Sequence, residues 1–552
     1  MLRSNYFRRL VTAALTGTAL ATVAAPAGAS NPLEYPDNGG AAFSRGGAWL
    51  ATATDPLAAH YNPAAMATQS SGFELGLLFA YQSVCFQRKN PGNADTGPRQ
   101  GQQETVGTGV RYAAVCNNTA EQPRIIPSLG LVWRATDSLA LGFAVVPPAT
   151  YGSVPGEWPT ITDARRADGT RIKAPAPYRY MTAGNQSTIL HPTFSFGYDL
   201  GGGLRVGAGF IWSLAVIDVQ SFGMRTTYST QKGDDAQVDS KSRLRTEDLF
   251  VPGAVVSVLW SLTDTLDIAA WGRWIDAIDT SKGSLDLISN YYTSNLQGIA
   301  PLCDDPTGTT CQGTAVPDDF SGFPGYFKQF RFIATPPEIR AGIRFHVPRG
   351  ETGPKVDVPK PTRDPLRDDV FDVELDGSWT MNSVADTITV RFAGNPDGTA
   401  VVPVKPLGNL PPRADRPTGY KDSYGVRLGG QYNLVQNVFG IRAGTWFETA
   451  AADAEYLNVA PVPAARGGFG GGIVVRRGSL DVSLGYQRHY SNGLDNKGNG
   501  KLKAGVGTQQ DPPNFRLGQE PDEQQFRSYN AINGGRVTQS ANVFAVGAVY
   551  RF

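Results

Sequence analysis

The chain of 552 residues lacks several features that define common protein classes. After its first 29 residues it has no uninterrupted apolar run of the ~18 residues that a transmembrane helix needs. Lys and Arg number 50 against 49 Asp and Glu, so no basic excess points to nucleic acid or to an anionic lipid surface. Charged residues make up only 18% of the chain.

Residues that carry metal or catalytic chemistry are also few. The four cysteines include no Cys-x-x-Cys spacing, and the four histidines (His60, His191, His346 and His489) are widely separated. Neither a metal site nor a sequence-local catalytic triad is indicated. We therefore predict a protein that is not an enzyme and that uses no metal or cofactor.

Residues 1–29 are predicted to be a secretory signal. Arg3, Arg8 and Arg9 form its charged start, an apolar stretch follows, and Ala27-Gly28-Ala29 fits the small-residue cleavage rule. A short membrane anchor is the alternative. Removal of the three arginines lowers the formal net charge from +1 to −2.

The chain is rich in apolar residues that alternate with polar or small ones. In residues 72–85, for example, Phe73, Leu75, Leu77, Phe79 and Tyr81 share one face of a strand. Transmembrane strands need only ~9–11 residues each, with apolar side chains at alternate positions. We predict fourteen such strands, near residues 72–85, 125–134, 139–145, 188–199, 204–217, 249–262, 266–280, 330–346, 370–382, 422–433, 438–448, 465–476, 480–490 and 544–552.

The lengths of the connections favour one class. Connections after odd-numbered strands are long, and those after even-numbered strands are mostly a few residues. This asymmetry is typical of an antiparallel transmembrane β-barrel with short periplasmic turns and long extracellular loops. We therefore predict a 14-stranded, multi-pass outer-membrane barrel over residues 71–552. One turn departs from the pattern, because residues 347–369 have the proline- and charge-rich composition of a linker. We predict a periplasmic linker there, most simply an insertion tolerated at a turn, with no function assigned.

Residues 43–66 have a different character. They are rich in Gly and Ala, show no alternation and contain too few large apolar residues to form a core of their own. Such a segment keeps a fixed shape only inside another structure. We predict that residues 30–70 are a plug, or hatch, inside the barrel.

This stretch resembles the N-terminal hatch of the FadL family of outer-membrane transporters for long-chain fatty acids and other hydrophobic compounds. The resemblance rests on Gly46-Gly47-Ala48, then Asp55, then Tyr61-Asn62-Pro63-Ala64. A second similar piece runs through residues 422–432 and 441–444. The resemblance implies a hatch built on Gly46, Gly47, Asp55, Asn62, Pro63 and Ala64. It also implies passive uptake of fatty acids or hydrocarbons by a monomer whose other partner is outer-membrane lipid.

Two features of the predicted wall bear on that function. Taking the apolar register as lipid-facing sends a polar set into the lumen: Arg340, Arg344, Asp372, Glu374, Asp376, Arg427 and Arg442. This set is either a polar track that receives a carboxylate head group or a ladder that braces the barrel and holds the hatch. Gly468, Gly470 and Gly472 also face inward, where glycines mark either close approach of the hatch or curvature of the wall. We predict that Ala64 of the hatch lies close to Gly468 and Gly470.

The third strand runs into Pro147-Pro148, where two successive residues lack a backbone donor. This position resembles the kink that opens the wall sideways in the FadL family. The alternative is that the strand simply ends there.

The cysteines fit export to an oxidising compartment, where disulfides persist. Four cysteines allow three pairings. We favour Cys85–Cys116 and Cys303–Cys311, each of which ties a single loop.

Three functions fit these observations. The first is a FadL-type channel for hydrophobic compounds. The second is a general porin, which needs an open pore and is disfavoured by residues 30–70. The third is a structural or adhesive barrel acting through its loops, among which residues 281–329 are rich in aromatic side chains.

Overall fold

The computed structural model describes residues 38–89, 111–118, 123–148, 156–165, 169, 171–224, 239–288, 325–349, 362–392, 402–404, 408–410, 413–502 and 533–552. The predicted secretory signal at 1–29 lies outside these residues.

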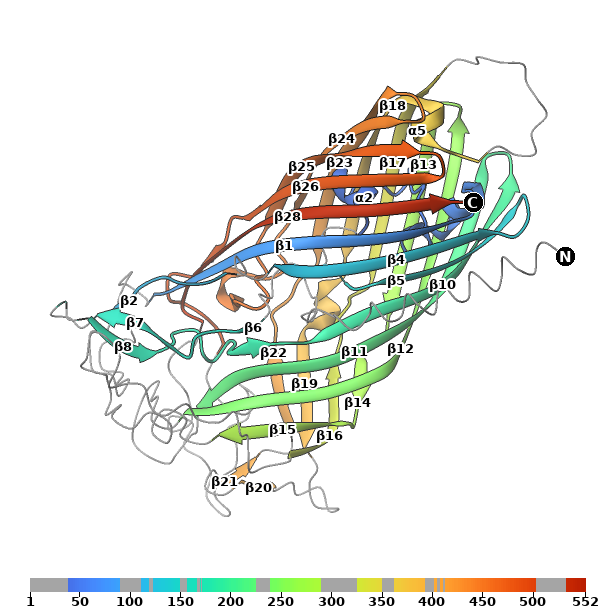
Figure 1. The fold of residues 1–552 in the computed structure, drawn as a ribbon. Helices are drawn as coiled ribbons and strands as arrows, with labels where there is room; N and C mark the ends of the chain where they lie inside the picture. Colours follow the sequence, from blue (N-terminus) through green and yellow to red (C-terminus); the bar gives the residue numbers. More distant parts are fainter. Residues whose placement is uncertain are drawn as a thin grey trace.

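Fourteen strands form one closed antiparallel barrel (Figure 1). In order around the wall they are β1 (Gly72–Arg88), β4 (Arg124–Arg134), β5 (Leu139–Val146), β10 (Thr188–Gly201), β11 (Leu204–Met224), β12 (Asp239–Thr263), β13 (Leu266–Ile275), β17 (Glu338–Pro348), β18 (Asp369–Thr380), β23 (Ser423–Val435), β24 (Phe439–Glu448), β25 (Arg466–Arg477), β26 (Leu480–Ser491) and β28 (Gly535–Arg551). The wall closes because β28 pairs with β1 along its whole length, from Arg551 opposite Gly72 to Gly535 opposite Arg88. The predicted all-β class and the fourteen-stranded barrel are confirmed.

Two predicted strands are each divided in the structure. The stretch predicted at 330–346 comprises β16 (Gly325–Phe332) and β17, which begins at Glu338. Pro336 and Pro337 separate them, since neither can donate a backbone hydrogen bond to the ladder. Likewise, the stretch at 266–280 comprises β13 and β14 (Ile278–Thr280).

Short elements complete the fold. The remaining strands are β2 (Arg111–Tyr112), β3 (Val115–Asn118), β6 (Gly156–Glu157), β7 (Ile161–Arg165), β8 (Arg171–Pro175), β9 (Gly184–Asn185), β15 (Gly283–Ile288), β19 (Thr387–Phe392), β20 (Val402–Val404), β21 (Gly408–Leu410), β22 (Arg413–Pro417) and β27 (Leu494–Asp495). The helices are α2 (Gly40–Ser44), α3 (Ala58–Tyr61) and α5 (Pro365–Asp368), with 3-10 turns η2 (Pro63–Thr68), η5 (Asn382–Ala385) and η6 (Ala454–Tyr456). Among the described residues, no helix combines the length and the apolar character needed to cross a membrane.

The two ends of the barrel differ, as predicted. At one end, turns of a few residues join β4 to β5, β10 to β11, β12 to β13, β23 to β24 and β25 to β26. The C-terminus lies at this end (Figure 1), where the Phe552 amide donates to the Ser71 carbonyl oxygen at 2.9 Å. We call it the short-turn end and the opposite one the long-loop end. The asymmetry is that of a transmembrane barrel, in which short turns are periplasmic.

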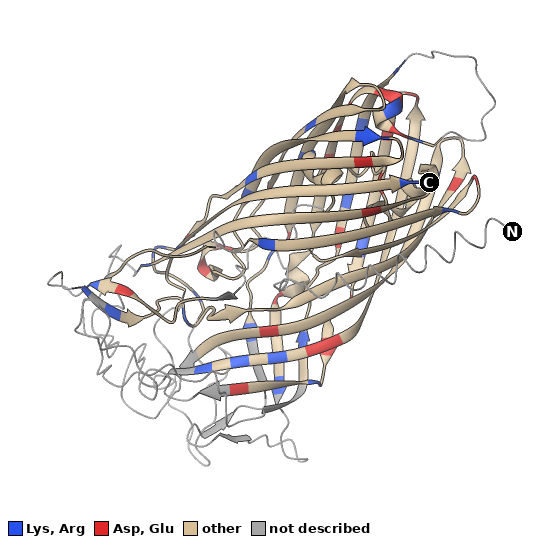
Figure 2. Cartoon of the chain, in the orientation of Figure 1, with Lys and Arg blue, Asp and Glu red and all other residues tan. Residues whose placement is uncertain are grey.

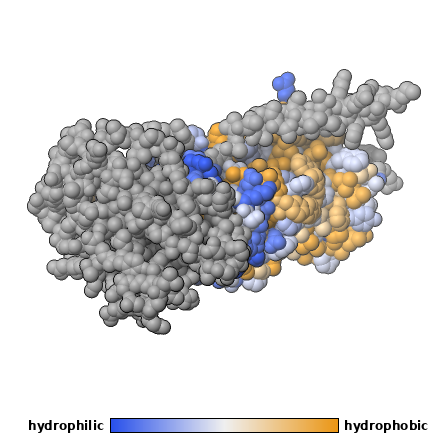
Figure 3. All heavy atoms as spheres, turned by 90° about the horizontal axis from the view of Figure 1, so that it is seen from below, coloured by the Kyte–Doolittle hydropathy of each residue, from blue (hydrophilic) through white to orange (hydrophobic). Residues whose placement is uncertain are grey.

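The outer face of the barrel is apolar. Large side chains at alternate strand positions are exposed, among them Phe194 (52%), Val256 (59%) and Phe544 (46%). Strand β28 carries no charged residue between Arg536 and Arg551, and Figure 2 shows this uncharged length. Seen from below, much of the described exterior is orange, with paler residues between (Figure 3). An apolar belt of this extent is a liability in water and is the face that a barrel turns toward lipid.

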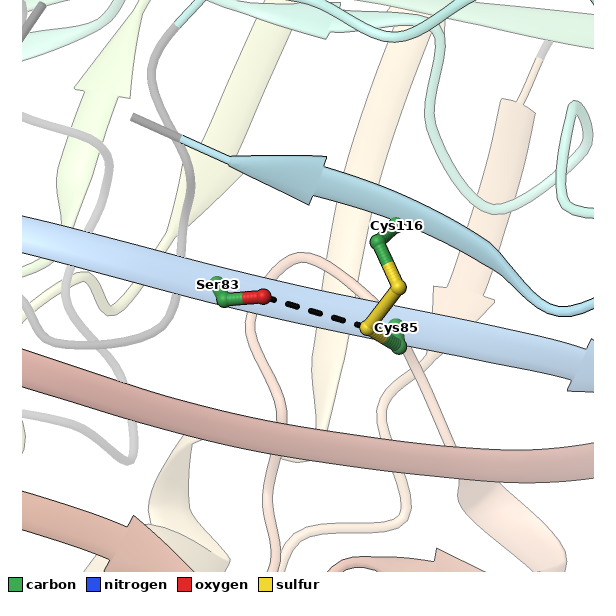
Figure 4. Close-up of a disulfide and its surroundings, with 3 residues drawn as sticks. All are labelled: Ser83, Cys85 and Cys116. Carbon is green, nitrogen blue, oxygen red and sulfur yellow. Dashed lines mark hydrogen bonds between the residues drawn. A yellow bond between two sulfur atoms is a disulfide. The ribbon is translucent and has the colours of Figure 1, made fainter. Parts of the chain in front are cut away.

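A disulfide fastens β3 to β1 near the long-loop end (Figure 4). Cys85 and Cys116 lie directly opposite each other in the β1–β3 pairing, with their Cα atoms 4.0 Å apart. The predicted Cys85–Cys116 bond is therefore present. The predicted Cys303–Cys311 bond lies outside the described residues and stays a prediction.

Candidate functional site

Residues 38–71, which we call the inner segment, lie within the barrel. Helix α2 packs against β24, β25, β26 and β28, whereas α3 packs against β4, β5 and β10, and η2 against β10, β11 and β12. The segment therefore touches opposite walls of the lumen. Its apolar side chains, including Phe43, Leu57 and Met66, are fully buried. Small residues allow this, because the backbone can approach the wall from several sides.

Carboxylates of β18 hold the backbone of the inner segment. Asp376 accepts hydrogen bonds from the amides of Trp49 and Leu50 at 2.9 and 3.2 Å. Glu374 accepts from the amides of Ala51 and Thr52 at 2.5 and 3.1 Å. The Thr52 hydroxyl also donates to Glu374. Four consecutive amides, which have no strand partner, are thus satisfied by two wall carboxylates.

Arg45 adds a charge to the same contact. Its guanidinium lies 2.5 Å from Asp372 and 3.5 Å from Glu374, and all three side chains are almost completely buried. Asp372 also pairs with Arg344 of β17 at 3.3 Å. A buried guanidinium and carboxylate require each other, because removing one leaves an uncompensated charge. We call Asp372, Glu374 and Asp376 the carboxylate row.

The Asn62-Pro63-Ala64 turn fixes the other side of the inner segment. Asn62 donates from its side-chain amide to the Leu50 carbonyl oxygen at 2.7 Å, which joins two parts of the segment. The Ala64 amide donates to the Ser257 hydroxyl of β12 at 2.9 Å. Pro63 begins η2, where its missing amide hydrogen needs no partner.

The predicted proximity of Ala64 to Gly468 and Gly470 is wrong. The turn lies instead over Gly197 of β10 and Gly207 of β11, where an added Cβ would overlap the backbone of Pro63 and Ala64. The path of an irregular segment is not periodic, so the sequence could not indicate which wall glycines it meets. Inward glycines do mark close approach to the inner segment, and Gly472 of β25 is one of them, since an added Cβ there would overlap the side chain of Ser44.

The other predicted hatch residues also have local roles. Gly46 and Gly47 have positive φ angles of 68° and 79°, which disfavour any residue with a Cβ. Asp55 is buried and accepts a hydrogen bond from the Leu57 amide at 3.1 Å, just before α3. These contacts give the segment one defined backbone path.

We expect Gly207→Val to displace the Asn62-Pro63-Ala64 turn, because the new side chain occupies the space of that backbone. Overpacking of this kind costs about 1–3 kcal/mol. Limited proteolysis of the purified protein should then cleave within residues 38–71 faster than in the unchanged protein. Gly377→Val is the matched control, since nothing lies within 4 Å of a Cβ added there. Equal cleavage in both variants would contradict the assigned contact.

The predicted polar set separates into three groups. The carboxylate row meets the inner segment, and Arg344 pairs with Asp372 of that row. Arg340 pairs with Glu338 at 2.7 Å, and Arg427 pairs with Glu448 at 2.9 Å, closer to the long-loop end. Arg442 belongs to neither group and donates to Gln431 and Ser483 at 2.7 and 2.9 Å.

The second group forms a charged belt around part of the lumen. Its members are Arg273, Glu338 and Arg340 on β13 and β17, and Arg427, Glu448 and Arg466 on β23, β24 and β25. Each glutamate lies between two arginines, so the belt carries an excess of positive charge. Trp271 and Trp446 lie under these guanidinium groups, with Arg340 5.1 Å and Arg466 5.9 Å from the ring centroids. We call this group the arginine belt.

The opposite half of the lumen is mainly apolar, and its buried polar groups include His191, which bonds Ser213, and Thr193, which bonds His60. Inward side chains of β4, β5 and β10–β13 pack with the inner segment into one buried cluster, which includes Val132, Ile211, Val255, Leu259 and Trp271. The lumen therefore has an apolar wall and a charged wall that face each other.

The hydrogen-bonded wall is interrupted beside the apolar half. Strand β5 ends at Val146, so residues 124–128 of β4 and 188–190 of β10 have no partner on β5. Pro147-Pro148 follows at this point. The side-chain amide of Asn38 donates to the Pro147 carbonyl oxygen at 2.9 Å, so the inner segment reaches this edge. We call the interval between β4 and β10 the wall break.

Sequence reasoning missed Arg45, Ser257 and Glu338. Arg45 is the one charged residue in the small-residue stretch 38–54, and a lone charge in a buried segment implies a partner. The lone charge of Arg45 could therefore have indicated a buried ion pair. No sequence feature distinguishes Ser257 from other inward polar residues.

A closed barrel with an apolar exterior, short turns at one end and its own N-terminal segment inside is a multi-pass protein of the bacterial outer membrane. No protein-family model and no curated protein matches the sequence. The fold, however, is similar to the crystal structure of a Pseudomonas aeruginosa FadL homologue, with a TM-score of 0.59, 15% identity, and coverage of 94% of this chain and 99% of that one. It is also similar to the Pseudomonas putida toluene transporter TodX, with a TM-score of 0.53, 13% identity, and coverage of 94% and 99%. The FadL-type fold predicted from the sequence motifs is confirmed.

Proposed function

We propose that this protein is a channel for the passive uptake of hydrophobic compounds, with residues 30–70 as its hatch and the wall break as a lateral exit. The observation that carries the proposal is the position of the wall break. It adjoins the apolar half of the lumen, and the inner segment lies across the remaining route to the short-turn end. An apolar molecule that entered from the long-loop end would reach the membrane without crossing the periplasm.

The apolar half favours a hydrophobic cargo. Binding sites for apolar molecules are lined mainly by apolar and aromatic side chains, with a few polar groups that fix orientation. The buried cluster around Val132, Ile211 and Leu259 is such a lining. Its side chains are apolar, which favours an apolar cargo over a sugar or an ion and argues against a general porin as the second candidate.

The arginine belt bears on which hydrophobic compound is carried. Guanidinium groups suit bidentate contact with a carboxylate, and the adjacent Trp271 and Trp446 suit an apolar chain or ring. This combination favours long-chain fatty acids. Aromatic hydrocarbons such as toluene, named for the similar TodX, would use the apolar wall alone. A belt already neutralised in part by Glu338 and Glu448 would also serve simply to brace the wall.

The test is uptake of a labelled long-chain fatty acid and of labelled toluene by bacteria with and without this protein. We expect faster uptake of at least one compound in the presence of the protein. Exchanging both Pro147 and Pro148 for Thr should then slow uptake several-fold, because the restored amide donors let β5 continue along β4 and close the wall break.

The matched control is the same exchange at Pro336 and Pro337, which also interrupt a strand but adjoin no wall break. Those changes should leave uptake unaltered. If cells with and without the protein take up both compounds equally, the proposal fails, and an adhesive or structural barrel becomes the better description.

A further inference from the structure

The connection between β17 and β18, predicted from composition as a linker, returns to the barrel over residues 362–368. This stretch ends in α5 and lies at the short-turn end, as Figure 1 shows. Pro365 and Leu366 are buried, which a tolerated surface insertion does not require. We call residues 362–368 the strap.

The strap is fastened to the wall on the side of β23–β26. Asp364 pairs with Arg476 of β25 at 2.5 Å. The Asn433 side-chain amide donates to the Pro365 carbonyl oxygen at 2.6 Å, and the Asn437 amide donates to that of Leu366 at 2.9 Å. These contacts involve the strand ends of β23 and β25 and the turn between β23 and β24.

Arg363 connects the strap to the inner segment. Its backbone amide donates to the Thr68 carbonyl oxygen at 2.8 Å, and its guanidinium donates to the Ala51 carbonyl oxygen at 3.5 Å. The same guanidinium pairs with Asp267 of β13, across the lumen from β25. Through its backbone amide and its side chain, this one residue thus meets the inner segment at Thr68 and Ala51 and the wall at β13.

Asp267 also joins Arg363 to the carboxylate row. Arg344 lies 3.1 Å from Asp267 and 3.3 Å from Asp372, and Asp372 pairs with Arg45 of the inner segment. Alternating charges therefore run from the strap, through β13, β17 and β18, into the inner segment. Paired charges that are mostly buried are little screened by salt. Because these residues belong to one network of ion pairs, we expect loss of one charge to change the stability of the neighbouring pairs.

We propose that the strap is a latch that holds the hatch in place from the periplasmic side, and that Arg363 is the residue that positions the hatch through it. The proposal rests on the proposed function only in treating the inner segment as the hatch. Its physical basis is that Arg363 contacts the segment at Ala51 and Thr68, on both sides of the Asn62-Pro63-Ala64 turn. The hatch cannot move toward the periplasm without breaking these contacts or carrying the strap with it, and movement of the strap would break the Asp267 pair.

The test compares Arg363→Ala with Arg477→Ala, the control, in planar bilayers without added substrate. Arg477 is exposed at the same end of the barrel and is the sequence neighbour of the strap's partner Arg476. We expect the fraction of time spent in ion-conducting states to rise about tenfold in Arg363→Ala, because charge-assisted hydrogen bonds that favour the closed state are lost. Arg363→Lys, which keeps the charge but cannot reach two acceptors in the same way, should give a smaller rise. Arg477→Ala should behave as the unchanged protein.

Equal conductance in all four proteins overturns the latch. If Arg363→Ala does not assemble, Arg363→Lys and Arg363→Gln decide the question in the same measurement. Because no substrate is present, a failure of the latch is distinct from a failure of the proposed uptake function. A protein that takes up neither compound could still show the tenfold rise, and a true transporter could lack it.

Discussion

Glu374→Ala is expected to open the barrel to small ions while leaving the barrel itself folded. Glu374 is fully buried and accepts hydrogen bonds from the amides of Ala51 and Thr52 and from the Thr52 hydroxyl. Its removal leaves these donors without acceptors and weakens the neutralisation of Arg45. Each buried unsatisfied group costs about 1–3 kcal/mol, so with three donors the inner segment should lose roughly 3–9 kcal/mol of its attachment.

The barrel ladder does not depend on this side chain, since β18 pairs with β17 and β23 through backbone groups. Folding can be checked by the shift in gel mobility on heating, and opening by conductance in planar bilayers. Glu448→Ala is the matched control, because Glu448 also faces the lumen between arginines but bonds only wall residues among those described. We expect that control to lose some thermal stability without added conductance. Closed channels in Glu374→Ala would show that the carboxylate row does not retain the segment.

Deletion of residues 43–66 should have the largest effect of all. The deletion removes the buried side chains of α2, α3 and η2 that fill the lumen between β4–β12 and β24–β28. A barrel of fourteen strands without such filling encloses a wide aqueous lumen. We expect stable, large conductance steps and passage of small sugars into liposomes that contain the deletion protein.

The deletion also separates the candidate functions. Uptake of apolar compounds should fall relative to uptake of polar solutes, because the apolar cluster loses the half contributed by the inner segment. A deletion protein that stays as closed as the intact one, with unchanged uptake, would reduce the inner segment to a structural filling. A barrel that opens only after both deletion of 43–66 and loss of Arg363 would indicate that the strap itself blocks the lumen.

Much of this architecture is set by local sequence. A strand with one face in lipid must carry apolar side chains at every second residue, so alternation predicted the fourteen barrel strands and their inward faces. It did not reveal that the stretches 266–280 and 330–346 are each divided. The parity of the connections fixed which end carries the short turns. The lack of alternation and of large apolar residues at 43–66 indicated that this stretch is not part of the wall and lies inside the barrel. Cys85 and Cys116 could be paired because each lies beside the same connection.

What the sequence could not decide is which inward groups meet across the lumen. Trp49 and Asp376 are 327 residues apart, and only closure of the barrel brings them to 2.9 Å. The register of a strand fixes its face but not the groups opposite it, and an irregular segment has no period from which its path can be read. For that reason the sequence did not indicate that the turn at Pro63 lies on Gly207 rather than on Gly468. Nor did the linker composition of residues 347–369 indicate that Arg363 bonds Thr68. Strand faces follow from local geometry, whereas the contacts of the inner segment follow from the shape of the closed lumen.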